Sequence, residues 1–205
     1  MTMAMAGWSA AASPVPIPAE AFATMVAGRA ASPVAVDLYD ENEHQKGLVA
    51  IWRDGSTDEE TTDRLKHLFR CRRTYREHTI AQPTLAMLAA VSEHFAGRTI
   101  EYVSAYRAGR EETRTSPHRH ATAIDFRIRG VQPSKIRDYV WKTYSGIGVG
   151  WYPEGQYIHM DTRPEKGDTA WTFRNGTNRY HPYWAELARR VEVPERVASH
   201  RRPGS

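Results

Sequence analysis

An aspartate, Asp125, lies in the middle of the apolar segment 123–128, Ala-Ile-Asp-Phe-Arg-Ile. The β-branched and aromatic residues of this segment predict a strand that is buried in a sheet. A buried carboxylate without a partner is costly, so the folded chain must supply a cation, a metal ion or several hydrogen-bond donors. Any fold of this chain therefore has to bring such partners to Asp125.

Two histidines are placed to be those partners. His118 lies in the turn that leads into the segment, and His159 lies in a second strand-like segment, 156–161, Gln-Tyr-Ile-His-Met-Asp. Residues two apart on a strand share a face, so His159 and Asp161 point to the same side. If the two strands are neighbours, His118, Asp125 and His159 meet in one pocket. Two imidazoles and a carboxylate can hold a tetrahedral zinc ion and leave its fourth position for water.

The structural alternative is a salt bridge from Asp125 to Arg107 or Arg127. Isolated histidines elsewhere in a chain are usually loop or surface residues. We expect that of five others: His44, His67, His78, His94 and His200.

The composition fits one domain with extensions at its ends. The 205 residues are 40% hydrophobic and 25% charged, which is ordinary for a globular protein. Much of the formal net charge of +4 comes from arginines near the C-terminus, and a solvated tail explains it better than a specific nucleic-acid partner does. The one cysteine, Cys71, excludes an internal disulfide and a thiolate-rich zinc site, and we expect a buried thiol on a helix.

No apolar run approaches the roughly 20 residues that span a bilayer, so we expect no transmembrane segment. Residues 1–12 lack the positively charged start of a secretory signal. The route of export and the oligomeric state are left open by these features.

Three regions are expected along the chain. Residues 1–33 are rich in Ala, Pro and Ser and predict a flexible N-terminal arm, with one short helix near residues 20–27. Residues 34–172 are expected to form the globular domain. Residues 173–205 are expected to be a basic C-terminal extension with a short helix.

The order of elements in the central region predicts an α+β domain. Strands are expected at 34–39, 47–52, 99–106, 123–128, 148–152 and 157–161. Helices are expected at 56–75, where Ser56 and Glu59 form a capping box, at 83–97, which Pro83 opens and Gly97 ends, and at 133–144. This order favours a central, mainly antiparallel sheet with helices packed on one side.

Several motifs resemble those of one known family. They are Val103-Ser-Ala-Tyr-Arg107, the pattern Ser116-x-His118-x-x-x-x-Ala123-x-Asp125, Gly146-Ile-Gly-Val-Gly-Trp-Tyr-Pro153 and Tyr157-Ile-His-Met-Asp-Thr-Arg163. In sequence and order they are similar to the zinc-site motifs of the M15-type peptidases, and most closely to the YcbK/MepK-like branch of murein endopeptidases, the DUF882 family. The resemblance covers about residues 34–172.

What the resemblance implies is a zinc metallopeptidase with the M15/hedgehog-like fold. Its substrate would be the peptide crosslinks or stem peptides of peptidoglycan, cut as an endopeptidase or a carboxypeptidase, in the periplasm or cell envelope. His118, Asp125 and His159 match the family's metal ligands. Arg107 matches an arginine that holds a substrate carbonyl or stabilises an oxyanion. Ser116 would orient His118 or bond to Asp125.

The general base is left open by the same comparison of motifs. Asp161 most simply holds the second ring nitrogen of His159, and it is also a candidate base; Glu154 and His120 are the others. The family usually has glycine where this chain has Ala121, which would be strained there if its φ were positive.

A peptidoglycan-binding or structural module with the same fold and no turnover is the alternative function. Trp151, Tyr152 and Trp184 are aromatic residues that such a module would use for contact with glycan or peptide. A weaker third hypothesis, nucleic-acid binding through the basic tail, predicts an affinity that collapses with salt. The sequence does not decide which peptide bond is cleaved.

Overall fold

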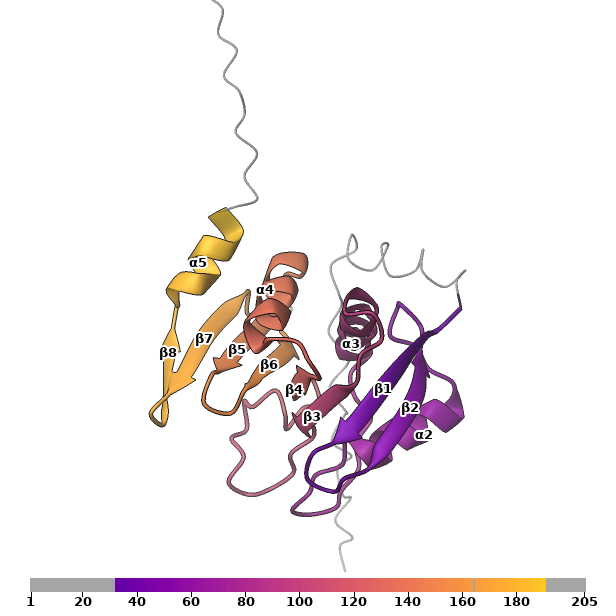
Figure 1. Ribbon diagram of the computed structural model, residues 1–205. Coiled ribbons are helices and arrows are strands. Elements are labelled where there is room, and N and C mark those ends of the chain that lie inside the picture. The colour runs from indigo at the N-terminus through magenta and orange to yellow at the C-terminus, as the bar shows by residue number, and fades with distance from the viewer. Residues whose placement is uncertain (1–31, 164, 191–205) are drawn as a thin grey trace, which may run out of the picture.

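The computed structural model describes residues 32–163 and 165–190, and in it helices cover one face of a sheet (Figure 1). The N-terminal arm lies outside this part as far as residue 31, as does the short helix expected within it. Residues 191–205 of the basic extension also lie outside the described part.

Eight strands of the described chain form one sheet in the order β2-β1-β3-β4-β6-β5-β7-β8. Their bounds are β1 (Val34–Asp40), β2 (Lys46–Ile51), β3 (Ile100–Ser104), β4 (Ala123–Ile128), β5 (Ile147–Tyr152), β6 (Tyr157–Thr162), β7 (Thr169–Arg174) and β8 (Thr177–Tyr180).

The α+β class is confirmed, but the sheet is mixed, and the expectation of a mainly antiparallel sheet was wrong. β1 and β3 are parallel, because the chain returns to the sheet through the helices α2 (Glu59–Leu68) and α3 (Gln82–His94). β5 and β7 are parallel, because the chain leaves β6 and passes β5 to reach its far side.

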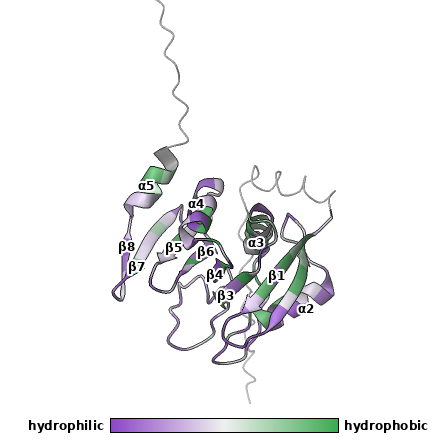
Figure 2. Cartoon of the chain, in the orientation of Figure 1, coloured by the Kyte–Doolittle hydropathy of each residue, from purple (hydrophilic) through white to green (hydrophobic). Residues whose placement is uncertain are grey.

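The helices, which also include α4 (Pro133–Thr143) and α5 (Tyr183–Arg190), pack on the core-facing side of the sheet. The strand side chains buried against them include Val36, Leu38, Ile124, Phe126, Ile158 and Met160. Figure 2 shows apolar segments gathered in β1, β2 and α3, whereas β8 is hydrophilic. Because side chains alternate along a strand, the polar residues between these apolar ones face the opposite side of the sheet.

Helix α2 is shorter than the sequence pattern predicts. Asp58, and not Ser56, is its N-cap, and the Asp58 carboxylate accepts a hydrogen bond from the Thr61 amide at 2.7 Å. The helix ends at Leu68, and the chain then turns so that the Cys71 amide donates to the Arg76 carbonyl at 2.9 Å. Cys71 is buried, as expected, but it lies in this turn and not on a helix.

The β7–β8 hairpin was not predicted, and the boundary expected after residue 172 falls inside β7. Asn175 and Gly176 form its two-residue turn, both with positive φ, as hairpin turns of this kind require. An Asn-Gly pair between two strand-like segments is a sequence signal for such a turn. The hairpin was not predicted because β8 is polar and its residues do not alternate between apolar and polar.

Helix α5 follows the hairpin and packs on α4. The Trp141 indole donates to the Ala185 carbonyl at 3.0 Å, and the Trp184 indole donates to the Thr172 hydroxyl at 2.9 Å. The Arg137 guanidinium lies between the rings of Trp151 and Trp184, 4.6 and 4.4 Å from their centres. Residues 173–190 are therefore part of the packed domain.

Across residues 32–163 and 165–190, every helix is too short or too polar to span a bilayer.

Candidate metal centre

The residues singled out by sequence meet on the face of the sheet that the helices leave open. β4 and β6 are antiparallel neighbours, with Asp125 opposite His159 and Ala123 opposite Asp161. His118 reaches the same point from the turn before β4. All three side chains expected to bind metal, His118, Asp125 and His159, are buried, between 3% and 4% exposed.

His118 is held by the main chain. Its Nδ1 lies 2.6 Å from the Ala105 carbonyl oxygen, which fixes that nitrogen as the N–H donor. The other nitrogen, Nε2, is then an acceptor directed at the site, 3.1 Å from His159 Nδ1 and 3.2 Å from Asp125 Oδ1. Of the two roles expected for Ser116, orienting His118 or bonding to Asp125, the Ala105 carbonyl fills the first.

His159 is held by a carboxylate. Its Nε2 lies 2.7 Å from Asp161 Oδ2, while its Nδ1 faces Asp125 Oδ1 at 2.7 Å. Asp161 is fully buried, and the Arg163 side chain donates to its second oxygen from Nε at 2.7 Å. Asp161 therefore has the position of a residue that orients a metal-binding imidazole.

The charges of this cluster are strongly coupled. Burial disfavours the charged imidazole of His159, but hydrogen bonds with Asp125 and Asp161 outweigh it and raise its pKa to about 9. Burial would raise the pKa of Asp125, yet the charges and hydrogen bonds of His118 and His159 hold it far below its ordinary value. Arg163 and His159 likewise outweigh burial and lower the pKa of Asp161 to about 2. The cluster thus keeps Asp125 and Asp161 ionised, and a bound metal ion would replace the proton that His159 holds beside them.

The donor set fits a metal ion. One ligand atom from each of His118, Asp125 and His159 can be chosen so that all lie within 4.8 Å of one another. Because Ala105 and Asp161 hold the other ring nitrogens, His118 Nε2 and, once a metal ion displaces its proton, His159 Nδ1 offer lone pairs at the common centre. Two imidazoles and one carboxylate are a typical set for zinc with one position open.

Two glycines of β5 make room for this cluster. A Cβ on Gly148 would collide with the carboxylate of Asp161 and the guanidinium of Arg163, and one on Gly150 would lie 2.5 Å from the Trp171 indole ring. The indole in turn packs against His159, with ring centres 5.0 Å apart. Trp171 was not singled out from the sequence as part of the site.

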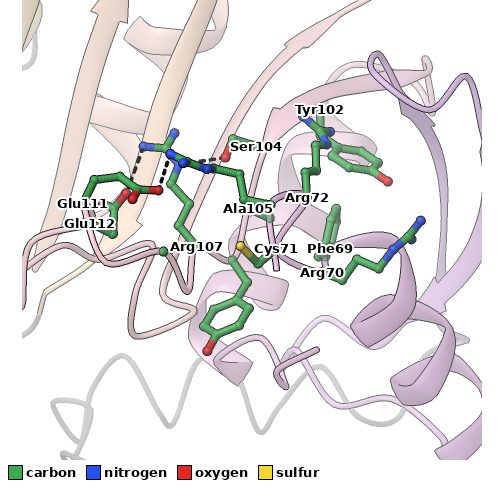
Figure 3. A pocket seen from close by; sticks show the side chains of 13 residues that line it. Phe69, Arg70, Cys71, Arg72, Tyr102, Ser104, Ala105, Arg107, Glu111 and Glu112 are labelled. Carbon is green, nitrogen blue, oxygen red and sulfur yellow. Dashed lines mark hydrogen bonds and ion pairs between the residues drawn. The ribbon is translucent and has the colours of Figure 1, made fainter. Parts of the chain in front are cut away.

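Arg107 lies at the rim of the cluster. Its Nε donates to Ser104 Oγ at 2.8 Å, and one terminal nitrogen donates to Asp125 Oδ2. The other terminal nitrogen lies 3.8 Å from Glu112, an acid from the loop after β3 that sequence reasoning missed. Figure 3 shows Arg107 reaching Ser104 and Glu112 in the wall of a cavity of about 260 Å³. The arginine partner offered as a structural alternative for Asp125 is thus present together with both histidines.

The remaining candidates lie away from the cluster. His120 is exposed, and its Nε2 lies 2.8 Å from the Arg114 carbonyl oxygen. Glu154 is exposed in the turn between β5 and β6. Four of the five histidines expected at the surface, His44, His67, His78 and His94, are exposed, and His200 lies outside the described residues.

Ala121, in the turn that carries His118, has φ +53° and is fully buried. This is the strained outcome that the sequence raised for an alanine where the family usually has glycine.

Comparison with known proteins gives one family. The family model described as "Peptidoglycan L,D-endopeptidase MepK" matches residues 28–167. A "Probable peptidoglycan L,D-endopeptidase MepK" of Haemophilus influenzae is 30% identical over 113 residues, which are 49% of this chain and 60% of the relative. The "Peptidoglycan L,D-endopeptidase MepK" of Escherichia coli K12 is 30% identical over 79 residues, 34% of this chain and 43% of the relative.

The chain therefore covers less than two thirds of either relative. No solved structure matches it significantly.

Proposed function

This chain belongs to the family described as peptidoglycan L,D-endopeptidase MepK, and we propose that it is a zinc-dependent hydrolase of peptidoglycan peptides. The bond that the family description favours is an L,D peptide bond, as in the names of the two relatives. The cell envelope, where peptidoglycan lies, is the proposed place of action. The observation that carries the proposal is the buried set His118, Asp125 and His159, with one donor atom of each turned to a common centre.

His118 Nε2, Asp125 Oδ1 and His159 Nδ1 are the proposed ligands. A zinc ion held by them supplies Lewis-acid chemistry, polarising a substrate carbonyl and acidifying water. Asp161 and the Ala105 carbonyl keep the imidazoles in the required tautomers. We assign Asp161 this positioning role, because its oxygens are fully buried and already bonded to His159 and Arg163.

Arg107 is proposed to meet the substrate. Its side chain is 38% exposed, and a guanidinium has five N–H donors, more than its contacts with Ser104, Asp125 and Glu112 use. Donors fixed beside the reacting carbonyl stabilise the negative charge that develops on its oxygen.

Glu112 is our proposed general base. Its carboxylate is near Arg107 at the rim of the cluster, and its side chain is only 18% exposed. A base must lie within hydrogen-bond reach of the attacking water. Glu154 and His120 are exposed and lie away from the cluster, so they suit this role less well. Glu112 would accept the water proton and return it to the leaving amine.

A matched pair of variants tests this assignment. We expect Glu112→Gln to lower kcat on a crosslinked muropeptide by about 100-fold with the zinc content unchanged. Glu111→Gln is the control. Glu111 is the chain neighbour of Glu112, but it is 53% exposed and pairs with Arg73 away from the cluster. Equal rates for the two variants would remove Glu112 from the reaction.

The function itself is tested by metal analysis and muropeptide release. Purified wild type is expected to hold about one zinc per chain and to release new fragments from purified sacculi, and His118→Ala to lose both. A folded wild type without zinc would contradict the proposal. Zinc with binding to sacculi and no new fragments would favour the alternative, a binding module without turnover.

A further inference from the structure

A second cavity lies on the same open face of the sheet as the metal centre. It has a volume of about 240 Å³ and is lined by Tyr152, Glu154, Gly155, Tyr157 and Phe173, at the end of the β5–β6 hairpin and on β7. The register places Gly150 opposite His159 and Tyr152 opposite Tyr157, so both tyrosines share the face of His159. They lie two residues along the strands from it, which is roughly 7 Å.

Aromatic contacts connect this cavity with the metal centre. The Tyr152 ring is stacked between Tyr157 and Phe173, with ring centres 4.6 and 5.2 Å away. The Trp171 indole donates to the Tyr152 hydroxyl at 3.3 Å, and its ring packs on His159. A substrate lying along the open face would thus contact the cavity and the metal centre together.

Glu154 is the charged residue of the lining. It is exposed, and within the described part of the chain it has no ion-pair or hydrogen-bond partner. The other lining residues, Tyr152, Gly155, Tyr157 and Phe173, are of uncharged types. The net charge of the lining is therefore −1, carried by Glu154.

Aromatic rings beside an unpaired carboxylate favour a cation. The electron-rich rings attract positive charge, and the carboxylate neutralises it at short range. The cavity is also smaller than the roughly 300–1,000 Å³ of sites for drug-sized ligands, so it suits a single side chain or a unit of similar size. Gly155 helps to shape it, because a Cβ there would lie 2.5 Å from Tyr157 Cε1.

We propose that this cavity is a substrate subsite for the side-chain ammonium group of a diamino acid in the peptidoglycan peptide, with Glu154 as its counter-ion. The proposal rests on the proposed function for the identity of the peptide. An extended peptide advances about 3.3–3.6 Å per residue, so a separation of roughly 7 Å corresponds to two residues or to one long side chain beside the cleaved bond.

The test compares two forms of one crosslinked muropeptide, with the diamino acid's amine free or N-acetylated. Acetylation removes the charge. We expect the zinc-loaded wild type to bind the free amine about tenfold more tightly by calorimetry, and to cleave it with a correspondingly higher kcat/KM through a lower KM. With Glu154→Gln, the affinity and the kcat/KM for the free amine are each expected to lie within about twofold of those for the acetylated form. Glu60→Gln, an exposed acid on α2, is the matched control and should keep the wild-type ratios.

A second variant, Gly155→Ala, displaces the Tyr157 ring without changing charge and is expected to reduce the preference as well. Wild type that does not distinguish the two forms would overturn the subsite. So would Glu154→Gln that loses activity equally on both, because that result gives Glu154 a role in the reaction and not in recognition. Preferential binding of the amine without turnover would keep the subsite and remove the proposed function, whereas turnover without preference would do the reverse.

Discussion

Each imidazole that we propose as a metal ligand has one nitrogen occupied by a fixed partner. For His118 the partner is a main-chain carbonyl, and for His159 it is the Asp161 carboxylate, which Arg163 holds. The two partners differ in how they can be tested, since a carbonyl cannot be mutated and a carboxylate can.

Asp161→Asn keeps the shape of the side chain and removes its charge. We expect zinc affinity to fall by about 10–100-fold, the usual effect of losing a partner of a ligating histidine. Competition with a chromophoric chelator measures this. Asp63→Asn, on the exposed face of α2, is the control and should bind zinc as wild type does. An Asp161→Asn protein with unchanged affinity would show that His159 is oriented by something else.

Ala121 provides a residue-scale measure of backbone strain. Left-handed backbone costs an alanine about 1–2 kcal/mol, whereas the loss of one buried methyl costs about 0.8 kcal/mol. These two terms oppose each other in Ala121→Gly, so we expect its unfolding free energy to stay within about 1 kcal/mol of wild type. Ala89→Gly, which is equally buried in α3, loses the methyl and helix propensity together and should cost about 2 kcal/mol. Urea unfolding compares them, and equal losses would mean that Ala121 is not strained.

At the scale of elements, α5 is attached to the domain by aromatic contacts. Trp184 packs on Arg137 and donates to Thr172, and Trp141 donates to the main chain of α5. Arg137 is itself buried and pairs with Asp138. The helix therefore covers a cation that would otherwise be exposed to solvent on one side.

Replacing Trp184 with alanine should expose that contact. We expect Trp184→Ala to lower the unfolding free energy by about 2–3 kcal/mol, somewhat less than for a fully buried aromatic residue. Its neighbour Tyr183 is 70% exposed, so Tyr183→Ala should change stability by less than about 0.5 kcal/mol. Denaturant unfolding measures the free energy of unfolding of both variants. Similar small losses for the two would mean that α5 adds little to the stability of the domain.

Most elements were predictable where side-chain pattern and chain-breaking residues agree. Pro83 lies in the first turn of α3 as expected, whereas the helix ends at His94, before Gly97. The alternation around Asp125 and His159 predicted β4 and β6. α2 was predicted too long, because apolar residues continue past Leu68 into a turn that buries them without helix. Strand direction was not predictable, since it depends on which neighbour the returning chain reaches and not on local sequence.

For the whole molecule, the candidate site was predictable in part. The carboxylate of Asp125 among apolar residues needs partners wherever the chain folds, and the positions of His118 in the preceding turn and His159 in a second strand-like segment make them those partners. The Ala105 carbonyl carries no side-chain signal, and Glu112 lies in a polar loop where acids are ordinary. Their roles depend on which loops meet at the sheet, and that is a property of the fold.

Zinc should stabilise the whole domain, because its proposed ligands come from β4, β6 and the loop between β3 and β4 that carries His118. At a free zinc concentration 100-fold above Kd, linkage adds about 2.7 kcal/mol to the unfolding free energy. For a domain of this size each kcal/mol raises Tm by about 2–4 °C, so we expect a rise of roughly 5–10 °C over the chelator-treated protein. His118→Ala should gain less than about 2 °C at the same zinc concentration, since it lacks one proposed ligand. Glu112→Gln should gain as much as wild type, because Glu112 is assigned to the reaction and not to the metal. A wild type whose Tm ignores zinc would contradict the metal centre independently of any assay of cleavage.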